Sequence, residues 1–324
     1  MKCNFKLFYK EEKGLALVLV AAAMTVILGF TALVVDVGAL YLTRNRLVNA
    51  CDAAALAGAK ELPDGQAEIV ARQYLLSNNL TTEEIDNNTL ISISTNNKII
   101  NVQTTRNVSY TFARILGFTS GDVKAEAAAV YGPVSAASGI TPFAVPDQEL
   151  VFNKQYVLKE GSGESVDDGS KIHGNFGALA LGGTGADKYE ENLKYGYDSE
   201  INVGDMVTVG EVVETEPGNM SGPTYDGVTY RMNKCTHGCT PQDYKTHCER
   251  IILVPVFDPS TLDQGRDDVL IVGFASFLLE GVNGTGNESE VTGTFLQMAP
   301  PPAGSYDINP DAPDYGLRAA KLVE

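Results

Sequence analysis

Residues 15–35 read LALVLVAAAMTVILGFTALVV, a run of 21 residues without a charged side chain. A helix rises about 1.5 Å per residue, so this run would be about 32 Å long, and the hydrocarbon core of a bilayer is about 30 Å thick. The run therefore predicts one transmembrane helix. Every residue that follows it would lie on one side of the membrane, and residues 1–14 would lie on the other.

Positive charge is concentrated before the span. Lysines occupy positions 2, 6, 10 and 13, whereas the first basic residues after the span are Arg44 and Arg46. Lys and Arg close to a span favour the cytoplasmic side, and acidic residues count little. We therefore expect a cytoplasmic stub at 1–14 and an extracellular location for the rest of the chain, in the cell membrane as a single-pass protein.

Two other interpretations of the N-terminus fit the sequence less well. A cleaved signal peptide has an apolar region of about 7 to 15 residues that ends at a small-residue cleavage site, but here the small residues Ala21–Ala23 lie in the middle of a longer run. The segment Val48–Cys51 loosely resembles a lipoprotein signal, but it lies well beyond the apolar run. A retained anchor is therefore predicted.

The charge of the chain excludes some partners. Over 324 residues the formal net charge is -17. Such an acidic chain repels nucleic acid and anionic lipid surfaces, so no nucleic acid is expected as a partner. The length suits one large or two ordinary domains beyond the anchor.

The helical pattern continues beyond the span. Apolar side chains recur there at intervals of three and four, and residues 50–59 are mostly alanine or glycine. Small side chains allow close packing against another backbone, which we expect to be the sheet that follows. Pro63 would end the helix, so residues 15–62 are predicted to form one transmembrane and anchor helix.

Residues 10–62 resemble the N-terminal module of TadG-like (TadE/TadG-type) proteins, which belong to the Flp or tight-adherence (Tad) pilus assembly systems of bacteria. Besides the apolar span, the positions that carry the resemblance are Gly14, Asp36, Gly38, Tyr41, Arg44, Asp52 and Gly58. The resemblance implies a membrane-anchored structural or accessory protein without catalytic activity. Its partners would be the lipid bilayer and other subunits of the pilus or secretion apparatus.

Two features of such families are missing from the sequence. Relatives that a prepilin peptidase cuts carry glutamate five residues after the glycine at the cleavage site, but the residue five after Gly14 is Leu19. Many TadG-like chains also carry a von Willebrand factor A domain with an Asp-x-Ser-x-Ser metal motif, which Asp167–Ser170 does not match. The resemblance therefore does not imply peptidase processing or metal-dependent adhesion.

The segment 63–133 predicts a small α/β unit seated on the anchor helix. Residues 66–80 have helical spacing, and two strands then flank a tight turn at Asn96-Asn97. A short helix at 109–116 and a third strand at 123–131 would complete the unit. Pilins also seat a sheet on a long N-terminal helix, so the unit is pilin-like by analogy of fold alone.

Beyond a linker at 134–139, short apolar runs alternate with Gly, Asn and Asp. Residues 140–298 predict a β-rich extracellular domain of the sandwich or barrel type, and residues 299–324 a C-terminal strap rich in Pro and Asp. The runs 251–256 and 270–274 are apolar on both faces, which indicates central strands. The expected strands are 150–158, 178–181, 207–213, 251–257, 269–279 and 291–298. The predicted fold class is α+β.

A cluster of metal-capable residues near position 240 could form a structural crosslink. It consists of Cys235, His237, Cys239, His247 and Cys248. Three thiolates and one imidazole could hold a tetrahedral zinc ion, whereas an extracellular location favours a disulfide with one cysteine left over. Unpaired thiols are the third alternative, and the sequence leaves all three open.

Catalytic signatures are incomplete. Cys248, a nearby histidine and Arg250 are the residue types of a sortase-like site, but the Thr-Leu-x-Thr-Cys pattern is missing. The glycine-rich segment 174–183 lacks the Gly-Lys-Ser/Thr order of a phosphate loop, so tight turns explain it better. We expect no enzyme activity and no cofactor other than a structural zinc ion.

The predicted function is therefore that of a non-catalytic, membrane-anchored structural or accessory protein of a Flp pilus apparatus. The alternative is a membrane-tethered extracellular binding module that is unconnected to pili. The sequence names neither the partner subunits nor a ligand of the distal domain.

Overall fold

The computed structural model describes residues 12–62, 65–94, 96, 98–160, 178–203, 212–214, 220–261, 268–284, 289–297 and 305–323. The chain divides into two compact units. The first comprises residues 1–129 and 322–324, and the second comprises residues 130–321. The chain passes from the first unit to the second inside one strand, β3 (Ser120–Ala137).

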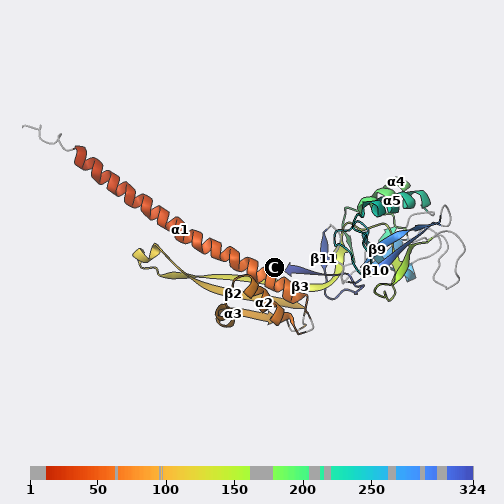
Figure 1. Cartoon of the computed structure of the whole chain (residues 1–324), viewed down its shortest axis with the longest axis horizontal. Coiled ribbons are helices and arrows are strands. Elements are labelled where there is room, and N and C mark those ends of the chain that lie inside the picture. The colour runs from red at the N-terminus through yellow and green to blue at the C-terminus, as the bar shows by residue number, and fades with distance from the viewer. Residues whose placement is uncertain are drawn as a thin grey trace, which may run out of the picture. The chain divides into compact units, whose positions relative to one another are not determined.

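The first unit is organised around helix α1 (Glu12–Ala59), which runs for 48 residues without a break (Figure 1). The large apolar side chains between Leu17 and Val35 are each 45% to 74% exposed. An 18-residue window of α1 has a mean hydropathy of 2.6, so the helix is long and apolar enough to cross a membrane. The predicted continuation of the apolar run into one long helix is confirmed.

The C-terminal half of α1 is buried along one face. Residues at most 1% exposed recur there at intervals of three and four: Leu47, Ala50, Cys51, Ala54 and Ala55. This half of the unit includes helix α2 (Ala67–Ser77) and strand β2 (Ile99–Ser109), and both pack on α1. They approach closely because α1 presents mainly methyl groups on this face, as the alanine-rich sequence predicts.

A sheet and two short helices complete the first unit: α3 (Thr82–Asn88), β1 (Thr89–Ile93), β2, the 3₁₀-helix η1 (Ala113–Leu116) and the first half of β3. β1 and β2 form the predicted antiparallel hairpin, with Thr89 opposite Thr104. α3 begins at a capping box in which the side chain of each of Thr81 and Glu84 accepts the backbone N–H of the other. The helix expected at 109–116 is shorter, because β2 continues to Ser109 and only η1 remains helical.

Residues 134–137, expected to belong to a linker, continue β3 instead. Val134, Ala136 and Ala137 are at most 3% exposed, and this part of the strand pairs with β6 (Ile201–Asn202) and β11 (Tyr306–Ile308). Small residues suit a buried strand as well as a linker, so composition does not distinguish the two. Within the predicted strap, residues 299–304 lie outside the described residues, and β12 (Arg318–Val323) pairs with β3.

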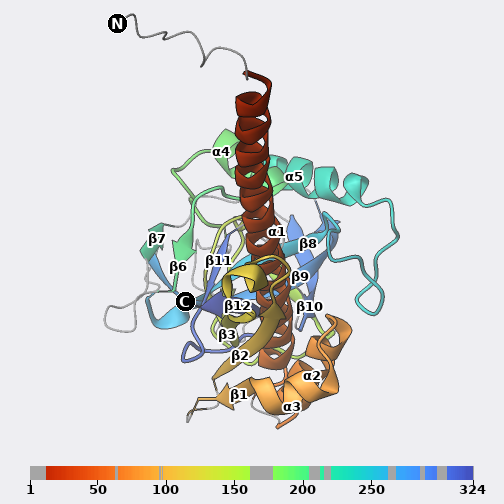
Figure 2. The ribbon, with the colours of Figure 1, turned by 90° about the vertical axis from the view of Figure 1, so that its left-hand side faces the viewer.

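The main sheet of the second unit has the strand order β4-β8-β9-β10-β5, and β7 pairs with β9. The bounds are β4 (Val145–Pro146), β5 (Gln155–Lys159), β7 (Val212–Glu214), β8 (Ile251–Asp258), β9 (Asp268–Asn283) and β10 (Glu290–Leu296), with the 3₁₀-helix η2 (Pro259–Thr261) after β8. β8, β9 and β10 lie next to one another (Figure 2). Among the described residues the sheet is open and does not close into a barrel.

Both faces of the predicted central strands are buried. On β8, Leu253 packs into a cluster with Ile140 and Leu181, whereas Ile252 faces a second cluster that includes Tyr189. A strand that is buried on both faces needs apolar residues at successive positions, which is what the sequence 251–256 supplies. The prediction that residues 251–256 and 270–274 belong to central strands is confirmed.

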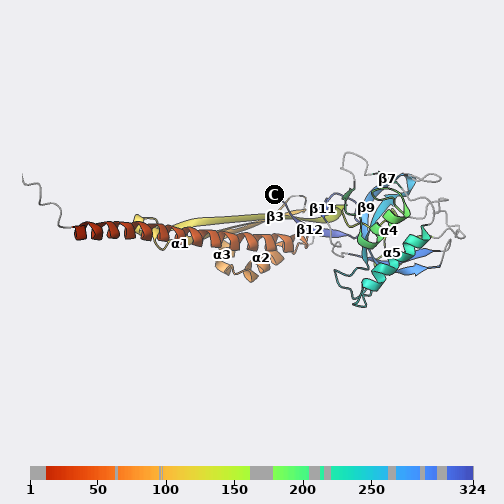
Figure 3. The same ribbon diagram turned by 90° about the horizontal axis from the view of Figure 1, so that it is seen from above.

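Two helices were not predicted from the sequence pattern, α4 (Ala186–Tyr195) and α5 (Ser221–Lys234) (Figure 3). They pack on each other, and α5 packs on β9. Tyr189 and Leu193 of α4 and Val228 of α5 are at most 1% exposed, and they pack in one cluster with Phe277. The region is β-rich as predicted, with these helices added. Of the other expected strands, 178–181 contributes only isolated bridge residues at Ala178 and Leu179, and most of 207–213 lies outside the described residues.

Candidate functional site

Asp36, the first charged residue after the apolar run, holds the loop between β2 and β3 against α1. Its Oδ1 accepts the backbone N–H of Thr111 at 2.7 Å. Its Oδ2 accepts the N–H of Phe112 at 3.0 Å and that of Ala113 at 2.7 Å. Asp36 is buried at this contact, with only 5% of the residue exposed. We call this set of three hydrogen bonds the Asp36 clasp.

The clasp satisfies backbone groups that would otherwise lack partners. The first N–H groups of any helical turn have no partner inside the helix, and η1 begins at Ala113. Hydrogen bonds to an ionised carboxylate are about twice as strong as those between neutral groups. The sequence pointed to Asp36 through the resemblance, but it gave no signal for a partner about 75 residues further along the chain.

At Gly58, α1 comes very close to the rest of the first unit. A Cβ atom at this position would lie 2.7 Å from Cδ1 of Ile100 and 2.8 Å from the backbone oxygen of Ala67. Real Cβ atoms essentially never approach other atoms so closely. Glycine at position 58 therefore lets α2 and β2 seat on the helix.

The other positions that carry the resemblance lie apart from these contacts. A Cβ atom on Gly38 would meet nothing within 4 Å, and both Tyr41 and Arg44 are exposed. The side chain of Asp52 is partly buried, and burial raises the pKa of its carboxyl group. Gly14 lies in α1 near its start. The fold of this unit therefore explains Asp36 and Gly58 but does not by itself require Gly38, Tyr41 or Arg44.

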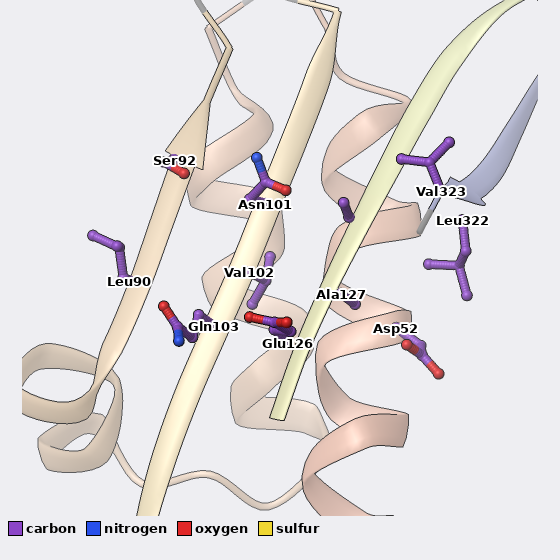
Figure 4. Close-up of a pocket in the computed structure, with 11 residues that line it drawn as sticks. Asp52, Leu90, Ser92, Asn101, Val102, Gln103, Glu126, Ala127, Leu322 and Val323 are labelled. Atoms are coloured by element: carbon purple, nitrogen blue, oxygen red, sulfur yellow. The ribbon is translucent and has the colours of Figure 1, made fainter. Parts of the chain in front are cut away.

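A cavity of about 670 Å³ lies in the first unit, with Asp52 in its wall. Its lining also includes Glu126 of β3 and Gln103 of β2, which lie beside each other in Figure 4. The eleven lining residues offer carboxylates, amides and the Ser92 hydroxyl, but no histidine or cysteine. The pairing of a serine with a histidine, which activates the nucleophile in many hydrolases, is therefore not found in this lining.

The structure brings the three distal cysteines together in the second unit. The sulfur atoms of Cys235, Cys239 and Cys248 all lie within 4.8 Å of one another, and the Sγ atoms of Cys235 and Cys248 are 3.3 Å apart. A disulfide bond is about 2.0 Å long, so each of the three is a free thiol in this structure. Cys235 follows α5, whereas Cys248 precedes β8, so the cluster joins two elements of the unit.

The environments of the cysteine sulfurs differ. Burial opposes ionisation of Cys235, but backbone N–H groups of Cys239 and His237 lower the pKa of its thiol to about 6. Burial raises the pKa of the Cys248 thiol to about 12. The cluster therefore contains a sulfur that is readily a thiolate, the form that binds metals, next to one that is protonated.

The two predicted histidines lie near each other but outside the group of sulfurs. The rings of His237 and His247 meet edge to face, with 5.2 Å between their centroids. Among the described residues, the group of ligand atoms within 4.8 Å of one another comprises only the three sulfurs. Cys239 and Cys248 also pack against Ile251 and Leu278, which shields one side of the group from water.

Comparison with known proteins identifies the N-terminal module. Residues 14–61 match the family model Tad, described as "Putative Flp pilus-assembly TadE/G-like". The match covers nearly the whole of α1 and confirms the resemblance drawn from the sequence, with no von Willebrand factor A domain indicated. A search of curated proteins and a search of solved structures each returned no match.

Proposed function

We propose that this chain, whose N-terminal module is that of TadE/G-like Flp pilus-assembly proteins, is a non-catalytic, single-pass structural or accessory subunit of that apparatus. The coincidence between the family match at 14–61 and helix α1 carries the proposal. One half of α1 exposes apolar side chains to its surroundings, and the other half seats a folded unit. A helix with one half exposed and apolar and the other half packed on a folded unit suits a membrane anchor.

The charge distribution supports an orientation. Lysines cluster before the span, and Lys and Arg close to a span favour the cytoplasmic side. In this proposal residues 1–14 lie in the cytoplasm, and the whole chain beyond the span at 15–35 lies outside the cell. The partners are then the lipid bilayer and other subunits of the pilus apparatus.

Three positions of the module are available for such subunits. Gly38, Tyr41 and Arg44 contribute nothing that the first unit needs for its own packing, although they belong to the matched segment. They lie just beyond the apolar run on the part of α1 that is still largely exposed. Contacts with neighbouring helices of the apparatus would give these residues a role.

Deleting the gene in its bacterial host is expected to abolish surface pili. The pilin subunit should still be made, because an accessory protein acts on assembly rather than on synthesis. Electron microscopy of the cells and an immunoblot of the pilin measure the two outcomes, and the gene supplied on a plasmid is the control. Normal piliation of the deletion strain would contradict the proposal and favour a tethered binding module unconnected to pili.

We also infer that the three distal cysteines form a structural site for a thiophilic divalent ion such as zinc. Zinc–sulfur bonds of about 2.3 Å in a tetrahedron place the sulfurs about 3.8 Å apart, which is compatible with sulfurs that all lie within 4.8 Å of one another. The backbone N–H groups that favour a thiolate at Cys235 support the same assignment. Solvent or a histidine would take the fourth position.

Elemental analysis of the full-length protein, purified without chelators, is expected to find about one zinc ion per chain. Cys239→Ser should lose the ion. Cys51→Ala is the matched control and should keep the ion. Cys51 is fully buried inside the first unit, and burial raises the pKa of its thiol to about 12. Absence of metal together with the loss of two titratable thiols would contradict the metal site and establish a disulfide.

A further inference from the structure

The loop between β2 and β3 carries an unusual number of exposed apolar side chains. We call residues 110–119 the hairpin tip. Within it Phe112 is 40% exposed, Phe118 is 63% exposed and Ile115 is 85% exposed. Ile115 is more exposed than any large apolar side chain described in the apolar run of α1. Turns in water are normally built from polar residues and glycine, so three such side chains in seven residues indicate a contact outside the unit.

The Asp36 clasp fixes where the hairpin tip lies along α1. Asp36 is one residue beyond the apolar run, and it binds three consecutive backbone N–H groups of the tip. Figure 1 and Figure 3 both show the tip, in yellow, beside the N-terminal half of α1. Since a helix rises about 1.5 Å per residue, a span that ends at Val35 places the clasp at the membrane boundary.

The clasp also makes the hairpin tip compatible with such a place. A backbone N–H without a hydrogen-bond partner is costly where water is scarce, and irregular loops are therefore rare at membrane depth. Asp36 supplies partners for the N–H groups of Thr111, Phe112 and Ala113. The apolar side chains can then face lipid without leaving these backbone groups unpaired.

We propose that the hairpin tip is a second membrane contact, in which Phe112, Ile115 and Phe118 insert into the lipid interface beside α1. This inference rests on the anchoring proposed above. The exposed Arg114, between Phe112 and Ile115, would lie at the level of the lipid phosphates. With a net charge of -17 the chain gains little from anionic lipid, so apolar insertion provides the attachment.

A second contact changes what the anchor does. A lone helix leaves the folded unit free to rotate about the helix axis, because nothing but the helix meets the membrane. A tip held in the interface restricts that rotation and the tilt of α1. The first unit would then present a constant face to its partners in the apparatus.

The chain contains no tryptophan, so a single introduced tryptophan reports its own surroundings. Phe118→Trp in the full-length protein, reconstituted in phosphatidylcholine bilayers, is expected to be quenched by brominated lipids and shielded from iodide in the water. Leu28→Trp in the span should behave in the same way. Tyr74→Trp is the matched control, since Tyr74 is 46% exposed on α2 at the other end of the unit, and it should be quenched by iodide alone.

The outcomes separate the tip from the anchor. If Phe118→Trp is quenched by iodide as Tyr74→Trp is, while Leu28→Trp is quenched by brominated lipid, the anchor stands and the membrane contact of the tip is refuted. If Leu28→Trp is also insensitive to brominated lipid, both proposals fail. Shielding of Phe118→Trp from both quenchers would refute the lipid contact and indicate that another protein chain covers the tip.

Discussion

Gly58→Leu is expected to lower the free energy of unfolding of the first unit by about 3 kcal/mol, because overpacking a tight contact costs roughly 1 to 3 kcal/mol or more. Even the Cβ atom would lie 2.8 Å from the backbone oxygen of Ala67, which cannot move without displacing α2. The larger leucine side chain would push α2 and β2 off the helix. Pulse proteolysis of the purified protein in increasing urea measures the loss.

Gly38→Leu is the matched control for this prediction. It makes the same substitution in the same helix, but a Cβ atom there meets nothing within 4 Å. Leucine is the better helix former by somewhat less than 1 kcal/mol, so stability should be unchanged or slightly raised. Equal effects of the two substitutions would mean that α2 and β2 do not seat on α1 at Gly58.

Asp36→Leu is expected to release the hairpin tip and to abolish surface pili. Leucine is close to aspartate in size but accepts no hydrogen bond, so the N–H groups of Thr111, Phe112 and Ala113 lose their partners together. Trypsin cleavage after Arg114 in the detergent-solubilised protein should accelerate on the order of tenfold or more, since hydrogen bonds to a charged group are among the strongest in proteins.

Two further variants test whether the faster cleavage depends specifically on the Asp36 carboxylate. Asp36→Asn keeps one carbonyl acceptor and should give an intermediate cleavage rate. Asp52→Asn removes another carboxylate from the same helix, but Asp52 lies about 24 Å further along α1 than Asp36, so the substitution should not accelerate cleavage. If Asp36→Leu is cleaved at the wild-type rate, the clasp does not hold the tip.

The features that could be predicted from the sequence are those with a strong local pattern. The uncharged run predicted α1, the turn at Asn96 predicted the β1–β2 hairpin, and the doubly apolar runs predicted β8 and β9. In each case neighbouring residues determine the element. No such local pattern indicates which distant elements each of them packs against.

The helices α4 and α5 were missed because their buried faces are partly polar. Asn192 is buried and donates to the carbonyl oxygen of Leu181, and Arg231 donates to the carbonyl oxygen of Leu193. Such side chains obscure an apolar stripe. The four-residue spacing of Tyr189 and Leu193 was nevertheless a helical signal that could have been used.

The candidate sites show the same limit. The resemblance singled out Asp36, but only the fold reveals that it binds a loop 75 residues away. The sequence gathered the cysteines and histidines near position 240, and the structure brings three sulfurs together without either histidine. The exposed side chains of the hairpin tip form no sequence motif. Their proposed membrane contact follows only from their position beside the end of the span.

Peptide mapping of the protein in carbonate-washed membranes tests most directly whether α1 stays uncut in the bilayer and continues into the folded unit. The predicted result is a membrane-bound chain that still contains residues before Leu15 together with those of the two compact units. Recovery of the mature chain from the culture medium, beginning beyond Val35, would contradict it.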